Sequence, residues 1–389
     1  MRRPVITSVI VMFAAASTLP AFAGWEEGVA AFKEKKYQQA AAEFQKLVDQ
    51  NPEGYRSHYM LGMSLQRLGR KEEALNHLRE AYNLNPNDLS IKLELGKAYY
   101  TVRRYAEVTK LLNTVDVSQL PSSHQPPFYQ MRGEAKLKMN DFNGGFADYK
   151  ALSKLSPKDA KVQYKLGAVA LKADKLDDAI RALDMAVQLD PNDSEKKTTY
   201  ANALIKKGRL TRDKTAKKSS YLKAAELATA VVAKDGSFDN LMLLMSAELG
   251  AGAYDKAVVT GEKAMAKNAT DWLVPFYIGQ AHTSSDQPVR AEAPLKKALD
   301  LAKKPEDQKK VWKQLGFAYE KQKKYSESIS AYQNAGDGSA VARVERNLET
   351  DRYNQQVEAE NEQIRRMEEE AARLEAELKA LEEGGGGGI

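Results

Sequence analysis

Apolar and small residues recur along the chain every three to four positions, the period of helices that bury one face. A clear example is "WKQLGFAYEKQKKYSESISAYQNA", residues 312–335. The positions that carry the period are Trp312, Leu315, Gly316, Tyr319, Tyr325, Ser328, Tyr332 and Ala335, with one break near 322–324. The pattern predicts two short helices joined by a tight turn. Such a pair leaves apolar faces uncovered, so we expect other segments to cover them.

The same unit recurs upstream. A small residue or Val followed four positions later by an apolar or small residue occurs at Ala40/Phe44, Ala74/Leu78, Val108/Leu112, Gly145/Tyr149, Ala179/Leu183, Ala224/Ala228, Ala257/Gly261, Ala291/Leu295 and Ser328/Tyr332. The first members are separated by 34, 34, 37, 34, 45, 33, 34 and 37 residues. In most units a glycine lies twelve residues earlier, at Gly28, Gly62, Gly96, Gly133, Gly167, Gly279 and Gly316. Several units end in a proline, at Pro52, Pro86, Pro157 and Pro191.

This sequence resembles the tetratricopeptide repeat family, whose unit of 34 residues has the pattern W-x2-L-G-x2-Y…A-x3-F…P. The resemblance is best at 312–319 and at 166–191, and nine units cover 24–336. It implies an all-α fold, a right-handed α-solenoid of helix-turn-helix repeats whose first helices line a concave face.

The first 23 residues are predicted to be a signal peptide. Arg2 and Arg3 precede an apolar run over 5–16, and Ala21-Phe22-Ala23 provides a small-x-small cleavage site. The alternative is an uncleaved membrane anchor, which the polar residues and Pro20 disfavour. We therefore expect an exported protein, most simply periplasmic, with an extracellular location as the alternative.

Composition and motifs argue against an enzyme. The chain has no Cys, which excludes disulfides, thiolate metal sites and a Cys nucleophile. Its histidines, His58, His77, His124 and His282, lack metal-ligand spacing. The G-x-G of "GAGAYDKA" falls on an inter-helix turn and not after a strand. We expect no catalytic residues, no metal and no cofactor.

A binding role is therefore predicted for the concave groove. Carrying the family pattern over position by position, the groove of the first three repeats would present Phe32, Tyr59, Met63, Arg67, Leu93, Lys97 and Tyr100. Aromatic residues and Met flanked by Arg and Lys suit an extended peptide or helix with apolar anchors and acidic charge. The alternative is that several of these residues pack against the adjacent repeat.

A second candidate site is a basic insertion in the sixth unit, "KKGRLTRDKTAKKSS", residues 206–220. We expect an inserted loop with seven cations against one acid: Lys206, Lys207, Arg209, Arg212, Lys214, Lys217 and Lys218. Because 14 acids and seven bases lie beyond residue 336 in a chain of net charge +6, the repeat body is basic. A basic exported protein suits acidic proteins, an anionic envelope polymer or an anionic lipid surface, and export argues against nucleic acid. The alternative is a solvated, mobile insertion.

The C-terminal segment is predicted to cap the solenoid over 337–352 and to form a coiled coil over 353–383, before a flexible glycine tail at 384–389. Apolar residues follow alternating spacings of four and three, with Glu360 as the charged exception. The expected seam includes Val357, Ile364, Met367, Ala371, Leu374, Leu378 and Leu381. We expect parallel self-association; the alternatives are a solvated lone helix and a helix folded back onto the basic repeats.

Together these patterns predict an exported scaffold or adaptor that binds envelope proteins in its groove and self-associates through its C-terminal helix. The alternative function is a polysaccharide- or peptidoglycan-associated envelope assembly or export factor that uses the basic repeat surface.

Overall fold

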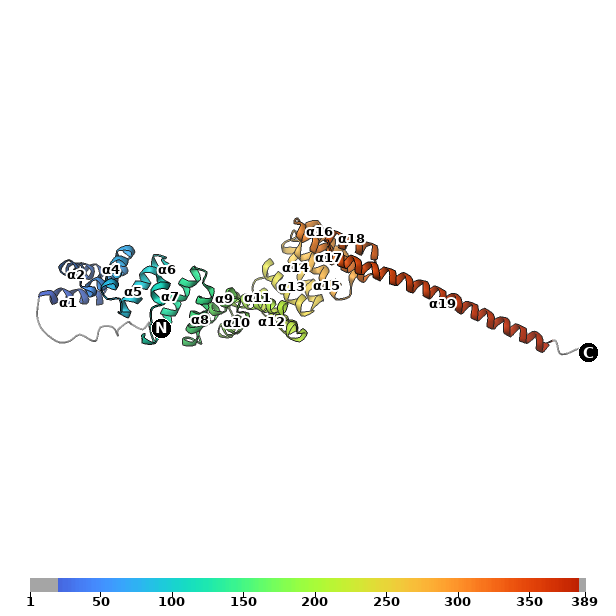
Figure 1. Ribbon diagram of the computed structural model, residues 1–389, viewed down its shortest axis with the longest axis horizontal. Coiled ribbons are helices and arrows are strands. Elements are labelled where there is room, and N and C mark those ends of the chain that lie inside the picture. Colours follow the sequence, from blue (N-terminus) through green and yellow to red (C-terminus); the bar gives the residue numbers. More distant parts are fainter. Residues whose placement is uncertain (1–19, 385–389) are drawn as a thin grey trace, which may run out of the picture. The chain divides into compact units, whose positions relative to one another are not determined.

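The computed structural model describes residues 20–384, with side chains from 24 to 381. All regular secondary structure in this part of the chain is helical (Figure 1). Helices α1 to α10 lie in one compact unit that ends at Asn192, and α11 to α19 lie in a second that begins at Asp193. Among the described helices, none is both long and apolar enough to cross a membrane.

The first unit contains five helical hairpins. Their helices are α1 (Pro20–Lys33), α2 (Tyr37–Gln50), α3 (Tyr55–Arg67), α4 (Lys71–Leu84), α5 (Leu89–Thr101), α6 (Tyr105–Leu112), α7 (Gln125–Lys138), α8 (Phe142–Leu155), α9 (Ala160–Lys172) and α10 (Leu176–Leu189). The third hairpin differs because α6 ends early and a 3-10 turn, η1 (Val117–Gln119), follows it. This connection accounts for the spacing of 37 residues between Val108 and Gly145.

The second unit contains four hairpins and a long terminal helix. Its helices are α11 (Ser194–Leu210), α12 (Lys214–Val232), α13 (Phe238–Ala251), α14 (Tyr254–Lys267), α15 (Leu273–Ser284), α16 (Pro288–Leu301), α17 (Pro305–Lys321), α18 (Tyr325–Ala335) and α19 (Gly338–Gly384). The prediction of an all-α chain of nine hairpins followed by a long C-terminal helix is confirmed.

The turn inside eight of the nine hairpins uses one residue with a left-handed backbone. These residues are Lys35, Gly69, Arg103, Asn140, Asp174, Gly252, Asp286 and Lys323, with φ between 54 and 79°. The turn satisfies carbonyl groups that the first helix leaves free: Lys36 N donates to the Ala31 carbonyl at 2.9 Å, and Arg70 N to that of Leu65 at 3.0 Å. The repeated turn gives these hairpins a common geometry.

Small residues allow the two helices of a hairpin to approach closely. At Gly167 an added Cβ would lie 2.6 Å from Cγ of Leu183, a side chain that is fully buried. Between hairpins the packing continues: Phe44 of the first belongs to the same buried cluster as Leu61 and Leu65 of the second. Each hairpin therefore completes its core only against its neighbour.

The basic insertion is not the loop that we expected from the sequence. The helices continue through it, so α11 has 17 residues and α12 has 19, and only Thr211 to Asp213 connects them. Asp213 caps α12, its carboxylate accepting a hydrogen bond from Ala216 N at 2.7 Å. Lys, Ala and Arg favour helix, and this cap fixes where α12 begins.

The C-terminal segment is one helix, where we expected a capping helix and a separate coiled coil. Near its start Ala340 and Val344 are buried against Tyr332 of α18, while Arg343 pairs with Glu320 of α17 at 2.7 Å. The predicted cleavage after Ala23 lies within α1, whereas residues 1–19 of the predicted signal peptide lie outside the described residues. The predicted glycine tail begins with the last residue of α19, and 385–389 also lie outside them.

Candidate functional site

The predicted groove residues lie on the first helices of three successive hairpins, α1, α3 and α5. Arg67 and Lys97 are exposed, while Phe32, Tyr59, Met63 and Tyr100 are half-buried. Leu93 is a correction, because it is only 8% exposed and belongs to the cluster of Val108 and Leu112. It fills the core and does not face a ligand. The remaining six leave apolar surface next to two cationic side chains.

The aromatic rings of this groove are fixed by their neighbours. Tyr59 packs against the cluster that contains Leu75 and Leu95, and burial, with the nearby Glu94 and Asp88, raises the pKa of its hydroxyl. The ring of Phe32 meets Tyr37 edge to face, with centroids 5.4 Å apart. Such rings lose little further freedom when a ligand binds.

Tyr100 connects the groove to the next hairpin. Its hydroxyl donates to Glu134 Oε2 on α7 at 2.6 Å, and burial is the main reason that the pKa of Tyr100 is raised. Tyr149 donates to the other oxygen of the same carboxylate at 3.4 Å. Sequence reasoning missed Glu134, although it directly follows Gly133, as Met63 follows Gly62 and Lys97 follows Gly96.

The first helix of the ninth hairpin carries a comparable residue that we did not predict. Phe317 of α17 directly follows Gly316 and is 40% exposed. The ammonium of Lys321 lies 5.8 Å from the centre of its ring, within the range of a cation–π interaction. Its place directly after a repeat glycine is the feature of the sequence that could have identified Phe317.

The basic hairpin, residues 206–218, joins the ends of α11 and α12. All seven predicted cations lie on these helices or their connection, and all but the half-buried Lys207 are exposed. The Arg209 guanidinium donates to Ser246 Oγ of α13 at 3.4 Å. Two exposed leucines, Leu210 and Leu222, lie beside the cations and are 66% and 51% exposed. The hairpin combines positive charge with exposed apolar side chains.

The predicted seam lies on the outer part of α19. Its large residues Ile364, Met367, Leu374, Leu378 and Leu381 are between 49% and 74% exposed. Ala371 is also exposed, and Val357 is half-buried. The described residues therefore leave this apolar line uncovered.

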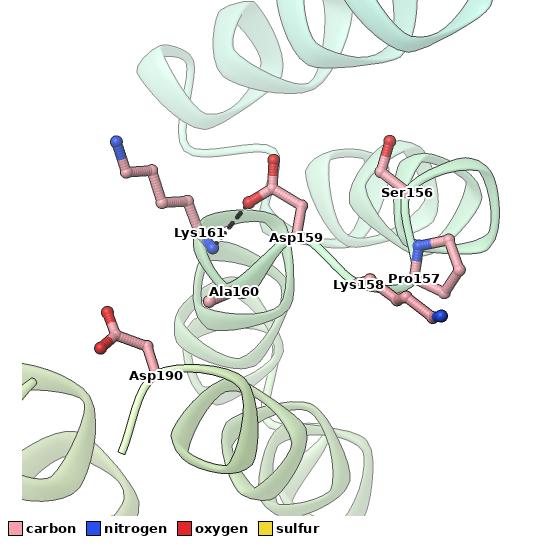
Figure 2. Close-up of a pocket in the computed structure, with 7 residues that line it drawn as sticks. All are labelled: Ser156, Pro157, Lys158, Asp159, Ala160, Lys161 and Asp190. Atoms are coloured by element: carbon pink, nitrogen blue, oxygen red, sulfur yellow. Dashed lines mark hydrogen bonds between the residues drawn. The ribbon is translucent and has the colours of Figure 1, made fainter. Parts of the chain in front are cut away.

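The pocket in Figure 2 lies at the turn between α8 and α9, next to the end of α10. Six of its seven lining residues are consecutive, from Ser156 to Lys161. Asp159 is already used there to cap α9 by accepting from Lys161 N at 2.8 Å. The pocket is therefore part of a helix-capping turn, and it brings together no convergent catalytic groups.

His58 and His77 form a pair between α3 and α4. Their Nδ1 atoms are 3.1 Å apart, and His58 Nε2 is 3.0 Å from the Pro52 carbonyl oxygen. Because a carbonyl only accepts, His58 donates from Nε2, so its Nδ1 accepts the hydrogen bond from His77 Nδ1. No group of three or more metal-ligating residues occurs in the part of the chain that the structure describes.

These features define a class of protein, an all-helical repeat scaffold whose exposed surfaces suit binding. The tetratricopeptide repeat family model matches residues 25–88, 59–107 and 131–194. This match supports assigning these repeats to that family, and tetratricopeptide repeats form protein–protein interaction scaffolds.

Two curated proteins are similar over part of the chain. Anaphase-promoting complex subunit 3 of Schizosaccharomyces pombe is 22% identical over 156 residues, 40% of this chain and 23% of that protein. Anaphase-promoting complex subunit CDC16 of Saccharomyces cerevisiae is 27% identical over 148 residues, 37% of this chain and 18% of that protein. The matches thus span a quarter or less of each relative's length.

Among solved structures, the C-terminal part of a TPR repeat-containing protein from Cytophaga hutchinsonii is similar, with a TM-score of 0.45 and 14% identity. The match covers 62% of this chain and 92% of that one.

The histidine pair predicts an acid sensitivity of the second hairpin. Burial, and then the charge of His58, lowers the pKa of His77, while Glu73 and Asp49 act in the opposite direction. Below pH ~6.5 the unfolded chain therefore takes up this proton more readily than the folded chain, and stability is lost as pH falls. We expect His77→Asn to lose less stability between pH 7 and pH 5 than the unsubstituted chain, measured as urea midpoints. His124→Asn is the control, and an identical pH dependence in all three proteins would contradict the explanation.

Proposed function

We propose that this chain is an exported interaction scaffold of the cell envelope, which binds a segment of a partner protein in the groove of its first three hairpins. The observation that carries the proposal is the exposure of Arg67 and Lys97 beside half-buried Met63 and aromatic rings fixed by their own neighbours. Apolar anchors with a cationic margin favour an extended or helical segment with apolar and acidic side chains.

The pairing of charges within the groove refines this proposal. Lys97 Nζ lies 2.6 Å from Glu94, so part of its charge is already compensated. Arg67 is exposed at the C-terminal end of α3. The guanidinium of Arg67 is therefore the better candidate for a carboxylate of the partner, since Arg can bind both oxygens at once.

Export rests on the sequence. The basic start, apolar run and Ala21-Phe22-Ala23 site are typical of a signal peptide, and the lack of Cys is compatible with an oxidising compartment. We place the partner among envelope proteins on this basis.

The groove proposal is tested by crosslinking from a photoreactive amino acid placed at Met63 in living cells. The control position is Glu80, which is exposed on α4, the second helix of the same hairpin. We expect a defined partner adduct from position 63 and not from 80, reduced severalfold by Arg67→Glu, since this substitution replaces attraction with repulsion. The same adducts from both positions, or adducts indifferent to Arg67→Glu, would contradict the proposal.

A second candidate function, binding of an anionic envelope polymer, is favoured by the basic hairpin. Arg212, Lys214, Lys217 and Lys218 are exposed together at the start of α12 and its connection. The N-terminus of α12 adds its own positive partial charge to theirs.

Neutralising the hairpin tests this second function. We expect the fourfold Gln variant at Arg212, Lys214, Lys217 and Lys218 to bind dextran sulfate several times more weakly at low salt, with the difference disappearing at high salt. The control substitutes four exposed lysines elsewhere in the second unit, Lys263, Lys267, Lys296 and Lys297. Helix content by circular dichroism confirms that all variants fold. If both variants weaken binding equally, only net charge matters and the hairpin is not a site.

The apolar spacing by itself predicts self-association through 353–383, but it does not take the charges beside the seam into account. The charges beside the seam bear on which helix covers it.

A further inference from the structure

The outer part of α19 has an apolar seam that the described residues leave exposed. Inside the second unit the helix is used only near its start, where Val344 is fully buried, whereas Leu374, Leu378 and Leu381 are more than half exposed. An apolar line of this length on a soluble helix is typical of a surface that binds a second helix.

Helix α19 cannot cover this seam by folding back onto α17 and α18, the hairpin that its own start caps. There is no Gly or Pro between residues 339 and 383, and α19 is one unbroken helix (Figure 1). The 31 residues from 353 to 383 extend over about 46 Å at the helical rise of ~1.5 Å per residue. A helix without a break cannot place this segment against its own starting hairpins.

The residues on both sides of the seam are either uncharged or negatively charged. With Ile364 and Leu378 at heptad position a, and Met367 and Leu374 at position d, the flanking e and g positions follow from the sequence. They are Asn354, Gln356, Asn361, Gln363, Glu368, Glu370, Glu375 and Glu377. No Lys or Arg occurs among them, and the acidic residues lie toward the C-terminal end.

The cationic side chains of this segment lie on the face of α19 away from the seam. They form ion pairs with glutamates of the same helix. Arg366 pairs with Glu362 at 2.8 Å, and Arg365 with Glu369 at 3.7 Å. Arg373 reaches Glu377 at 3.3 Å. These pairs support the helix but place no positive charge beside the seam.

A second copy of the chain is consequently a poor match at neutral pH. In a parallel pair, Glu370 of one helix lies opposite Glu375 of the other. In an antiparallel pair, e positions meet e positions and g positions meet g positions, so carboxylates again face carboxylates. The seam favours association, and its flanks oppose association with an identical helix.

We propose that residues 353–381 of α19 bind a basic amphipathic helix of a partner protein. Its apolar residues cover the seam, and its Lys or Arg side chains pair with Glu368, Glu370, Glu375 and Glu377. The neutral flanks near Gln356 and Gln363 leave the first half of the segment unselective, so the last two heptads determine partner choice. This site is independent of the groove proposed above.

The test uses the whole chain and two synthetic 31-residue helical peptides as probes. Both carry Ile at a and Leu at d; one has Lys at every e and g position and the other has Glu. In fluorescence anisotropy titrations at pH 7 and low salt, we expect the Lys peptide to bind at least tenfold more tightly, with the advantage reduced at high salt. Equal affinity for both peptides would overturn the proposal.

A charge-reversed chain distinguishes this site from other acidic or basic surfaces. Glu368→Lys/Glu370→Lys/Glu375→Lys is expected to reverse the preference between the peptides. The matched control, Glu358→Lys/Glu362→Lys/Glu369→Lys, makes the same charge change on the outer face and is expected to keep it. If both variants reverse the preference, or neither does, the flanks do not select the partner.

The competing occupant, a second copy, is tested on the unsubstituted chain by light scattering at tens of micromolar. We expect a monomer at pH 7, because the like charges on the flanks oppose pairing of identical helices. A dimer at pH 7 that Leu374→Asp/Leu378→Asp abolishes would overturn the choice of a basic partner.

Discussion

No hairpin of this chain can bury its own apolar side chains, and the rest of the structure depends on this constraint. Phe44, Leu61 and Leu65 belong to one core although they come from two hairpins. Leu295 and Leu315 likewise share a cluster across the hairpins α15/α16 and α17/α18. The stability of each hairpin therefore depends on its contacts with the adjacent hairpins, and the last hairpin of the array needs another segment to cover its exposed face.

This constraint also determines which residues remain for binding. Positions that face the next hairpin, such as Leu93, are used for packing. The positions directly after the repeat glycines are not used in this way, and their side chains differ in chemical type from one hairpin to another. Met63, Lys97, Glu134 and Phe317 occupy that position in four hairpins. The scaffold is thus conserved in geometry along the chain while its exposed chemistry changes from repeat to repeat.

The hairpins could be predicted because glycine, small residues and apolar residues recur with a nearly fixed period. The extension of α11 and α12 could not, because "KKGRLTRDKTAKKSS" lacks apolar periodicity, and helix formation there depends on propensity and the Asp213 cap. The burial of Leu93 was hidden because the repeat pattern does not show how closely Val108 and Leu112 approach. The glutamates beside the α19 seam, in contrast, are visible in the sequence, but the apolar spacing that predicts a coiled coil does not depend on them.

The most direct measurement of the neighbour constraint is hydrogen exchange in α17 and α18 of chains that stop early. Ala340 and Val344 cover Tyr332, and Asp351 accepts from Tyr325 at 2.8 Å, so the start of α19 serves as the end cap. A chain ending at Asp351 is predicted to protect these amides as the whole chain does, and one ending at Gly336 to lose that protection. Equal protection in both shortened chains would show that the last hairpin is stable without a neighbour, which contradicts the account.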